Sequence, residues 1–166
     1  MTLRQKCFAA LVLLSLSTCG FAQSNDHPVS ASAASAKFGT LPVLPSCLTF
    51  AVDRGDPTKG ASVLLAKATN GCLIPWHWHT YSEQLMFVGG SAKVEMKDGQ
   101  PAIMKKGDYV FLPGKHQHQF TCQADCQFFI VTEGAFDIHY MDNSGKEIPP
   151  EQALKISAAP KKSPKK

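Results

Sequence analysis

The stretch Gly71–Gly90 reads GCLIPWHWHTYSEQLMFVGG and brings His77, His79 and Glu83 close together in the chain. In a β-strand, residues two apart point to the same face, so the imidazoles of His77 and His79 can be aimed at one point. Glu83 has the same parity. Neutral imidazole nitrogens and carboxylate oxygens are ligands that suit a divalent transition metal. This stretch therefore predicts most of a metal site.

A second histidine cluster follows at His116 and His118. One histidine from this neighbouring strand would complete a site of three nitrogens and one carboxylate oxygen, with positions open for water or substrate. An isolated His-x-His pair is more often a surface or core feature. Here the accompanying glutamate, the second cluster and the glycine spacing favour metal binding. We expect His139, in contrast, to be a structural strand residue.

The first cluster resembles the first motif of the cupin superfamily. That motif is a glycine, five residues, His-x-His, three or four residues, a glutamate, six residues and a glycine. Every element is present, at Gly71, His77, His79, Glu83 and Gly90. The residues His-Trp-His within this motif and the flanking segments 55–57 and 136–140 are similar to those of small, single-domain bacterial cupins.

The second cluster resembles the second cupin motif, which is a glycine, five residues, Pro-x-Gly, two residues, a histidine, three residues and an asparagine. The matching residues are Gly107, Pro113 and His118. The chain departs from the motif twice, with Lys115 at the second glycine and Cys122 at the asparagine, while a glycine stands one position early at Gly114. Neither departure is at a ligand position, so only the shape of the loop is put in question.

The resemblance implies an all-β fold, a cupin-type jelly-roll β-barrel. It implies a site for one divalent transition metal (Fe, Mn, Ni, Cu or Zn) held by His77, His79, Glu83 and His118, with Glu83 also able to move protons as a catalytic group. His116 is either a further histidine near the metal or a residue at the strand entrance, and we favour the second. The implied function is a metal-dependent enzyme, of dioxygenase or isomerase type, acting on a small oxygen-rich chelating substrate. The alternative is a non-catalytic binding or sensing cupin.

The remaining sequence agrees with an all-β class, because short β-type runs alternate with turn residues and no helical pattern intervenes. We expect ten strands, at 47–52, 62–68, 73–79, 84–88, 91–96, 102–104, 109–112, 116–122, 126–132 and 136–140. Pro149-Pro150-Glu151 predicts the start of one short helix. No internal repeat is present, so a single barrel is expected.

Four segments are expected along the chain. Residues 1–22 have a basic start, a short apolar run and small residues before Gln23, as in a secretory signal peptide cleaved near Ala22. Residues 23–37 read as a flexible linker, 38–148 as the barrel domain, and 149–166 as a short helix with a basic disordered tail. We therefore expect a periplasmic or secreted protein.

Composition excludes some partners. The formal charge of +4 comes from 17 basic and 13 acidic residues. Four of the lysines lie in the tail at 161–166, and two basic residues belong to the signal peptide, so the barrel itself is slightly acidic. Nucleic acid is not an expected partner, because its binding needs basic residues spread over a folded face. No later stretch is long and apolar enough for a membrane span.

Four cysteines follow the predicted signal peptide, namely Cys47, Cys72, Cys122 and Cys126. An even number in an oxidising compartment suggests disulfides. Residues 123–125 read as a tight hairpin loop that would let Cys122 bridge to Cys126 and leave Cys47 for Cys72. Four free, buried cysteines are the alternative, and the sequence leaves both open.

Strand alternation past Glu83 turns Leu85 and Phe87 inward, as an apolar wall around the metal. A small-molecule ligand in such a pocket is the expected partner. The opposite parity carries Trp76, Trp78, Met86 and Val88, where a water-exposed face would be polar. This face needs a cover, either the segment 38–50 or a second subunit, so a homodimer is a hypothesis.

Overall fold

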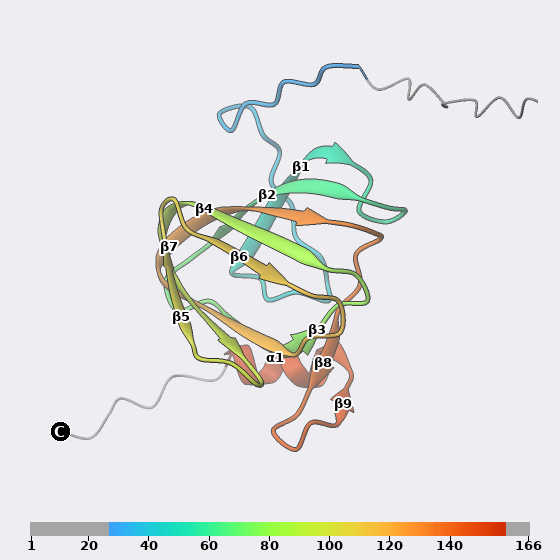
Figure 1. Ribbon diagram of the computed structural model, residues 1–166, viewed down its shortest axis with the longest axis vertical. Coiled ribbons are helices and arrows are strands. Elements are labelled where there is room, and N and C mark those ends of the chain that lie inside the picture. Colours follow the sequence, from blue (N-terminus) through green and yellow to red (C-terminus); the bar gives the residue numbers. More distant parts are fainter. Residues whose placement is uncertain (1–26, 159–166) are drawn as a thin grey trace, which may run out of the picture.

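The computed structural model of the protein describes residues 27–158, as nine strands and one helix within that range (Figure 1). The strands are β1 (Leu48–Gly55), β2 (Ser62–Ala68), β3 (Leu73–Trp78), β4 (Glu83–Met96), β5 (Ala102–Lys105), β6 (Tyr109–Leu112), β7 (His118–Thr132), β8 (His139–Met141) and β9 (Glu147–Ile148). The helix is α1 (Pro150–Ala158). The predicted signal peptide and the basic tail at 161–166 lie outside the described residues.

All strand pairs are antiparallel, and the sheet curls into a barrel in the order β1-β2-β7-β3-β8-β9, with β4 pairing β5, β6 and β7 (Figure 1). Because β7 pairs with β2, β3 and β4, it joins both halves of the barrel. The fold is all-β, of jelly-roll type, with one short helix after the last strand, which confirms the predicted class.

The two longest strands, β4 and β7, were each expected as two strands separated by a turn. Each runs on through its turn residues instead, and the register between them shifts at Gly89 and Ser91, where both strands bend. Gly90 makes this possible, because its φ is +68° and a side chain there would collide with the carbonyl oxygen of Asp125. Gly89 and Gly90 therefore mark a bend in a continuous strand rather than its end.

The continuity of β7 corrects the expected hairpin at 123–125 and its disulfide. Cys122 and Cys126 are both buried and free, and the Cys122 thiol donates hydrogen bonds to the carbonyl oxygens of Ala68 (3.2 Å) and Ala124 (2.8 Å). Cys47 and Cys72 do form a disulfide. Each of the two alternatives was therefore half right.

This disulfide ties the segment before β1 to the start of β3. Leu41 and Leu44 of the segment and Phe50 of β1 turn into the barrel and line its interior. A bridge between Gly39 and Phe50 fixes the segment on β1. The segment 38–50, expected as a cover for the outer face, thus closes the inside of the barrel.

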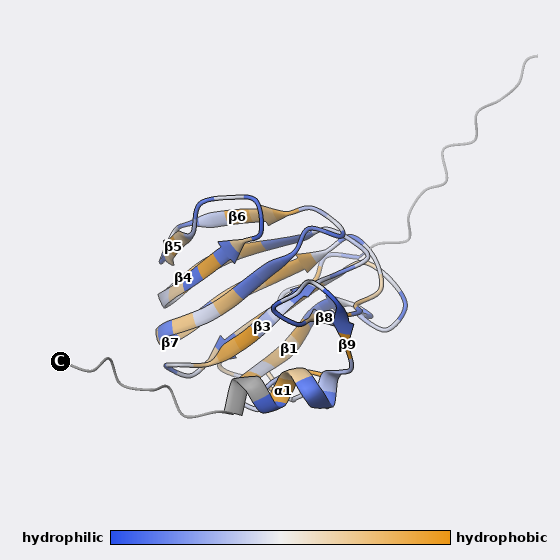
Figure 2. Cartoon of the chain, turned by 90° about the horizontal axis from the view of Figure 1, so that it is seen from below, coloured by the Kyte–Doolittle hydropathy of each residue, from blue (hydrophilic) through white to orange (hydrophobic). Residues whose placement is uncertain are grey.

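The helix α1 packs on β3 and β8 at one end of the barrel, where Ala153 is completely buried (Figure 2). In the described part of the chain, no helix is long and apolar enough to cross a membrane.

The loop between β6 and β7 shows why the glycine of the second motif stands one position early. Gly114 lies so close to the carbonyl oxygen of Thr80 that a Cβ would stand 2.6 Å from it. Lys115, at the usual glycine position, has φ +64° and donates its backbone N–H to the His79 carbonyl (2.7 Å). The loop keeps the left-handed backbone with a lysine in it, which costs about 1–2 kcal/mol.

Because of this strain, two substitutions of lysine by glycine should differ in their effect on the free energy of unfolding. Lys115→Gly relieves the left-handed backbone, whereas Lys106→Gly, in the β5–β6 turn, only adds freedom to the unfolded chain. We expect Lys115→Gly to be about 1 kcal/mol more stable than Lys106→Gly in denaturant unfolding. Equal free energies of unfolding for the two variants would contradict the strain.

Candidate metal centre

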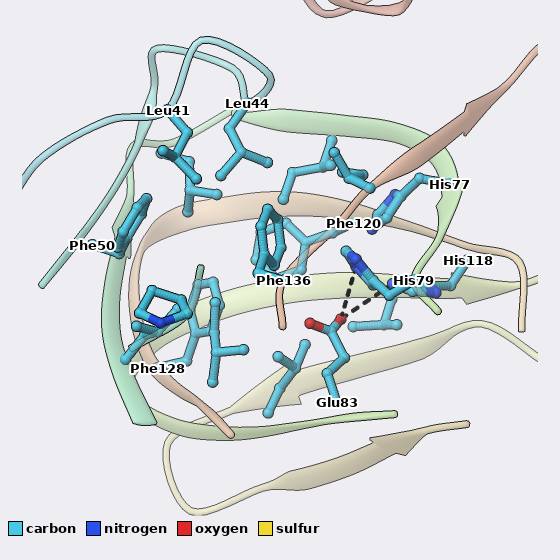
Figure 3. Close-up of a pocket in the computed structure, with 18 residues that line it drawn as sticks. Leu41, Leu44, Phe50, His77, His79, Glu83, His118, Phe120, Phe128 and Phe136 are labelled. Carbon is cyan, nitrogen blue, oxygen red and sulfur yellow. Dashed lines mark ion pairs between the residues drawn. The ribbon is translucent and has the colours of Figure 1, made fainter. Parts of the chain in front are cut away.

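Four side chains converge at one end of the barrel interior, and each comes from a different place in the fold. His77 is on β3, His79 follows its last residue, Glu83 begins β4 and His118 begins β7. All four are buried, and one ligand atom from each lies within 4.8 Å of the others. Figure 3 shows the histidines gathered on one side of the chamber with Glu83 below them. These are the four residues that the sequence selected.

The three imidazoles are held in one tautomer by the backbone. Each Nδ1 lies against a carbonyl oxygen: that of Pro75 for His77 (2.6 Å), that of Asp137 for His79, and that of His116 for His118 (2.9 Å). A carbonyl oxygen only accepts, so each Nδ1 carries the proton and each Nε2 presents a lone pair. Metal-ligating histidines are oriented by the same kind of outer hydrogen bond.

The Nε2 lone pairs of His79 and His118 face the carboxylate of Glu83, and two acceptors cannot form a hydrogen bond with each other. The Nε2 atom of His118 lies 3.2 Å from Glu83 Oε1, and that of His79 lies 3.7 Å from the same oxygen. His118 Nε2 is buried and has no hydrogen-bond partner in the described structure. Acceptors facing one another call for a cation between them. Two ligands that are each about 2.1 Å from one ion, at angles of about 90–120°, are about 3.0–3.6 Å apart. The His118–Glu83 separation of 3.2 Å lies in this range and the His79–Glu83 separation of 3.7 Å lies just above it, so a small side-chain adjustment lets the residues fit a divalent metal.

The electrostatics of the cluster favour the ligand protonation states. Burial, together with the nearby His118 and His79 side chains, pulls the pKa of His77 well below its ordinary value. Burial alone would raise the pKa of Glu83. In the metal-free protein, the positive charge that His79 and His118 acquire when a proton takes the place of the ion outweighs burial and keeps this pKa lowered. At neutral pH the cluster therefore contains a neutral His77 and an ionised Glu83.

These shifts predict how the metal-free protein responds to acid. The unfolded chain takes up a proton at His77 near its ordinary pKa of 6.5, while the native chain resists it. Stability rises with pH wherever the unfolded state binds more protons. The free energy of unfolding should therefore fall as pH drops below about 6.5, and fall further below the ordinary Glu83 pKa of 4.5. Urea unfolding between pH 8 and 4 measures it, and a flat profile from pH 7 to 5.5 would contradict the assignment.

Asp137 lies in the flank 136–140 that resembles other small cupins, but the sequence assigned it no role in the site. Its carbonyl receives the Nδ1 proton of His79, and its carboxylate accepts the backbone N–H of Thr80 (2.8 Å). Burial would raise the pKa of Asp137, but its bonds to Thr80 outweigh burial and lower this pKa. Asp137 thus positions His79 from a loop far along the chain. A backbone carbonyl carries no sequence signature, so no motif could have identified it.

The other two histidines of interest stand outside the cluster. His116 contributes its carbonyl to His118 and not its imidazole to the centre, in line with the favoured interpretation. His139 on β8 stacks on Trp78 at 3.8 Å between ring centroids and lies 2.8 Å from Glu147. It is a structural strand residue, as expected.

The cluster opens into an apolar chamber. Of the 18 lining residues, 14 are apolar and the other four are the cluster itself. Leu85 lines the chamber as predicted, whereas Phe87 packs behind it against Phe120 and Phe128. Figure 3 shows Leu41, Leu44 and Phe50 on the side away from the histidines. The centre is thus a small polar patch at one end of an otherwise apolar cavity.

Comparison with known proteins identifies the region that contains this site. Residues 66–131 match the family model described as "Cupin domain", and this range includes all four residues of the cluster. Over 82 residues, or 49% of the chain, the sequence is 30% identical to the DNA damage-repair/toleration protein DRT102 of Arabidopsis thaliana. The chain spans only 26% of that protein's length.

Several solved structures have the same fold. An RmlC-like cupin from Shewanella frigidimarina superposes with a TM-score of 0.56 at 16% identity, covering 64% of this chain and 91% of that one. The DMSP lyase DddQ from Ruegeria pomeroyi gives 0.57 at 16% identity, with 74% and 75% covered. KdgF from Halomonas sp. gives 0.53 at 14% identity, with 64% and 94% covered. At these identities the likeness concerns the fold alone.

Proposed function

Because the chain belongs to the cupin superfamily, we propose that it is a metal-dependent enzyme acting on a small substrate that chelates the metal. The proposal rests on one observation above all. Three imidazole Nε2 lone pairs and the carboxylate of Glu83 converge at the inner end of a chamber, and no hydrogen bond satisfies the His118 nitrogen in the described residues. A site for divalent iron, manganese, nickel, copper or zinc fits this donor set.

The residues divide the chemistry between them. His77, His79, Glu83 and His118 would hold the ion, which when bound supplies Lewis acidity to an oxygen of the substrate. Among the described residues, Glu83 is the one carboxylate that lines the chamber, and in its ionised form it can accept a proton from a substrate hydroxyl. The apolar walls exclude water from the reacting groups, which strengthens the electrostatic interactions inside. Enediols, catechols and diketones are the substrate types that this arrangement suits.

The enzyme reading is tested by reconstituting the metal-free protein with each ion in turn and offering it a panel of such chelating compounds. Oxygen uptake distinguishes the dioxygenase version, and substrate loss without oxygen uptake distinguishes an isomerase. Because one structural neighbour is named a lyase, cleavage products are followed as well. We expect turnover with at least one ion.

The same assay on variants assigns the turnover to this centre. His79→Ala and His118→Ala should lower turnover at least 100-fold and lose stoichiometric metal while the barrel stays folded. His27→Ala, on the exposed segment before the barrel, is the matched control and should retain both. If no ion supports turnover of any compound, the enzyme reading fails. Thermal stabilisation by a compound without product would then favour the alternative, a binding or sensing cupin.

Export to an oxidising compartment is part of the proposal. The first 22 residues have the pattern of a signal peptide, and the disulfide between Cys47 and Cys72 supports export because such bonds persist in the periplasm or outside the cell.

A second copy of the chain is the partner that we propose for the outer face of the sheet. Tyr109 and Phe111 of β6 are about half exposed, and both lie beside β4, opposite Met86 and Gln84. Val88 continues this face and is 38% exposed. The face carries aromatic and aliphatic groups without a formal charge, so it complements itself across a two-fold axis.

Light scattering at micromolar concentration tests this assembly, with a dimeric mass expected for the wild-type protein. Phe111→Lys should give a monomer, because it buries two unpaired charges across the two-fold contact, and Lys106→Glu, in the neighbouring turn, should leave the mass unchanged. A monomeric mass for the wild-type protein would contradict the assembly.

A further inference from the structure

We propose that the chamber selects ligands with one chelating head of at most a single negative charge and an uncharged, apolar body. This inference rests on the proposed metal centre and narrows its substrate class. It rejects compounds that carry a second anionic group or several hydroxyls beyond the head.

The distribution of polar groups along the chamber supports this class. All four polar side chains lie at one end, and the remaining wall is made of leucine, isoleucine, valine, proline and phenylalanine. Phe50 and Phe128 lie on the side away from the histidines, with Phe120 and Phe136 between (Figure 3). A ligand that reaches the metal must therefore place the rest of its structure against hydrocarbon. Such a wall favours the binding of ligands that bury apolar surface against it.

The charge balance of the chamber limits the head. Three neutral imidazoles, one carboxylate and a divalent ion sum to a single positive charge, which one monoanionic chelating group neutralises. No lysine or arginine lines the chamber within the described residues, so a second carboxylate or a phosphate would have no counter-charge there. Burying an unpaired charge is strongly unfavourable. Dianionic ligands are therefore excluded because the wall has no counter-charge for their second anionic group, even where the metal binds the first.

Hydrogen bonding limits the body. The Nδ1 atoms of the three histidines are already bonded to backbone carbonyls, and their Nε2 atoms face the ion. Among the described residues of the wall, Glu83, at the head end, is the only other side chain that can accept a hydrogen bond, and none can donate one. Each hydroxyl beyond the head would lose its bonds to water without gaining new ones, which weakens binding. A polyhydroxylated body is disfavoured for this reason.

The cavity also limits the size of the body. It leaves about 50 Å³ for the centres of water-sized groups, whereas one water needs about 10–15 Å³. A short alkyl chain or a single aromatic ring suits this space. Leu41, half-buried on the segment before β1, belongs to the wall at the far end and can be changed without altering a strand.

Three hydroxamates with the same chelating head separate these requirements: acetohydroxamate, benzohydroxamate and 4-carboxybenzohydroxamate. Their affinities for the zinc-loaded protein are measured by calorimetry and normalised to their affinities for free zinc in solution. We expect benzohydroxamate to bind at least tenfold more tightly than acetohydroxamate. The added carboxylate should remove at least this tenfold gain.

Substitution at position 41 tests whether the wall sets this order. Leu41→Lys places a cation at the far end of the chamber. It should therefore weaken the binding of benzohydroxamate and tighten the binding of 4-carboxybenzohydroxamate, so that the ratio of the two affinities changes at least tenfold in favour of the carboxylated compound. Leu41→Met, a matched change without charge, should preserve the wild-type order. Equal normalised affinities for the three probes on zinc-loaded protein would overturn the inference and leave the metal centre standing. A protein that takes up no zinc would overturn both.

Discussion

Three hydrogen bonds from imidazole Nδ1 atoms to backbone carbonyls are the constraint on which the site depends. They come from the carbonyls of Pro75, His116 and Asp137, and they turn the Nε2 lone pairs of three histidines toward Glu83. Two of these carbonyls lie two residues before the histidine that they orient. For these two histidines, the chain just before the histidine supplies the group that fixes its tautomer, from β3 itself for His77 and from the loop before β7 for His118. The third comes from a distant loop and ties that loop to the centre.

The barrel provides the surroundings that make this arrangement useful. Pairing of His77 with His118 across β3 and β7 brings two imidazoles together, and β4 enters the barrel at Glu83 alongside β7. The bend at Gly90 lets β4 and β7 run on as continuous strands that span the barrel. The segment before β1, anchored by the disulfide between Cys47 and Cys72, closes the far end with leucines. A buried polar cluster and an apolar cavity therefore follow from the same topology, and together they favour chemistry on a small chelating compound.

Much of this organisation could be predicted from the sequence because it is encoded in side-chain types at fixed spacing. The first motif selected His77, His79 and Glu83, although these residues lie on β3, just after it and at the start of β4 rather than on one strand. The second motif selected His118 over His116. Features that depend on backbone contacts could not be predicted. The glycines at 89–90 and the residues at 123–125 look like turns, yet tertiary pairing carries both strands through them. Pairing of cysteines depends on distances between strands, and the role of Asp137 depends on a carbonyl that every residue possesses.

The central claim is that the lone pairs converging on Glu83 hold one metal ion. Elemental analysis of untagged protein, purified without chelators from the cells that produce it, tests this most directly. The account predicts one equivalent of a divalent transition metal per chain. Protein that contains no metal, and whose unfolding temperature does not change when iron, manganese, nickel, copper or zinc is added, would contradict it.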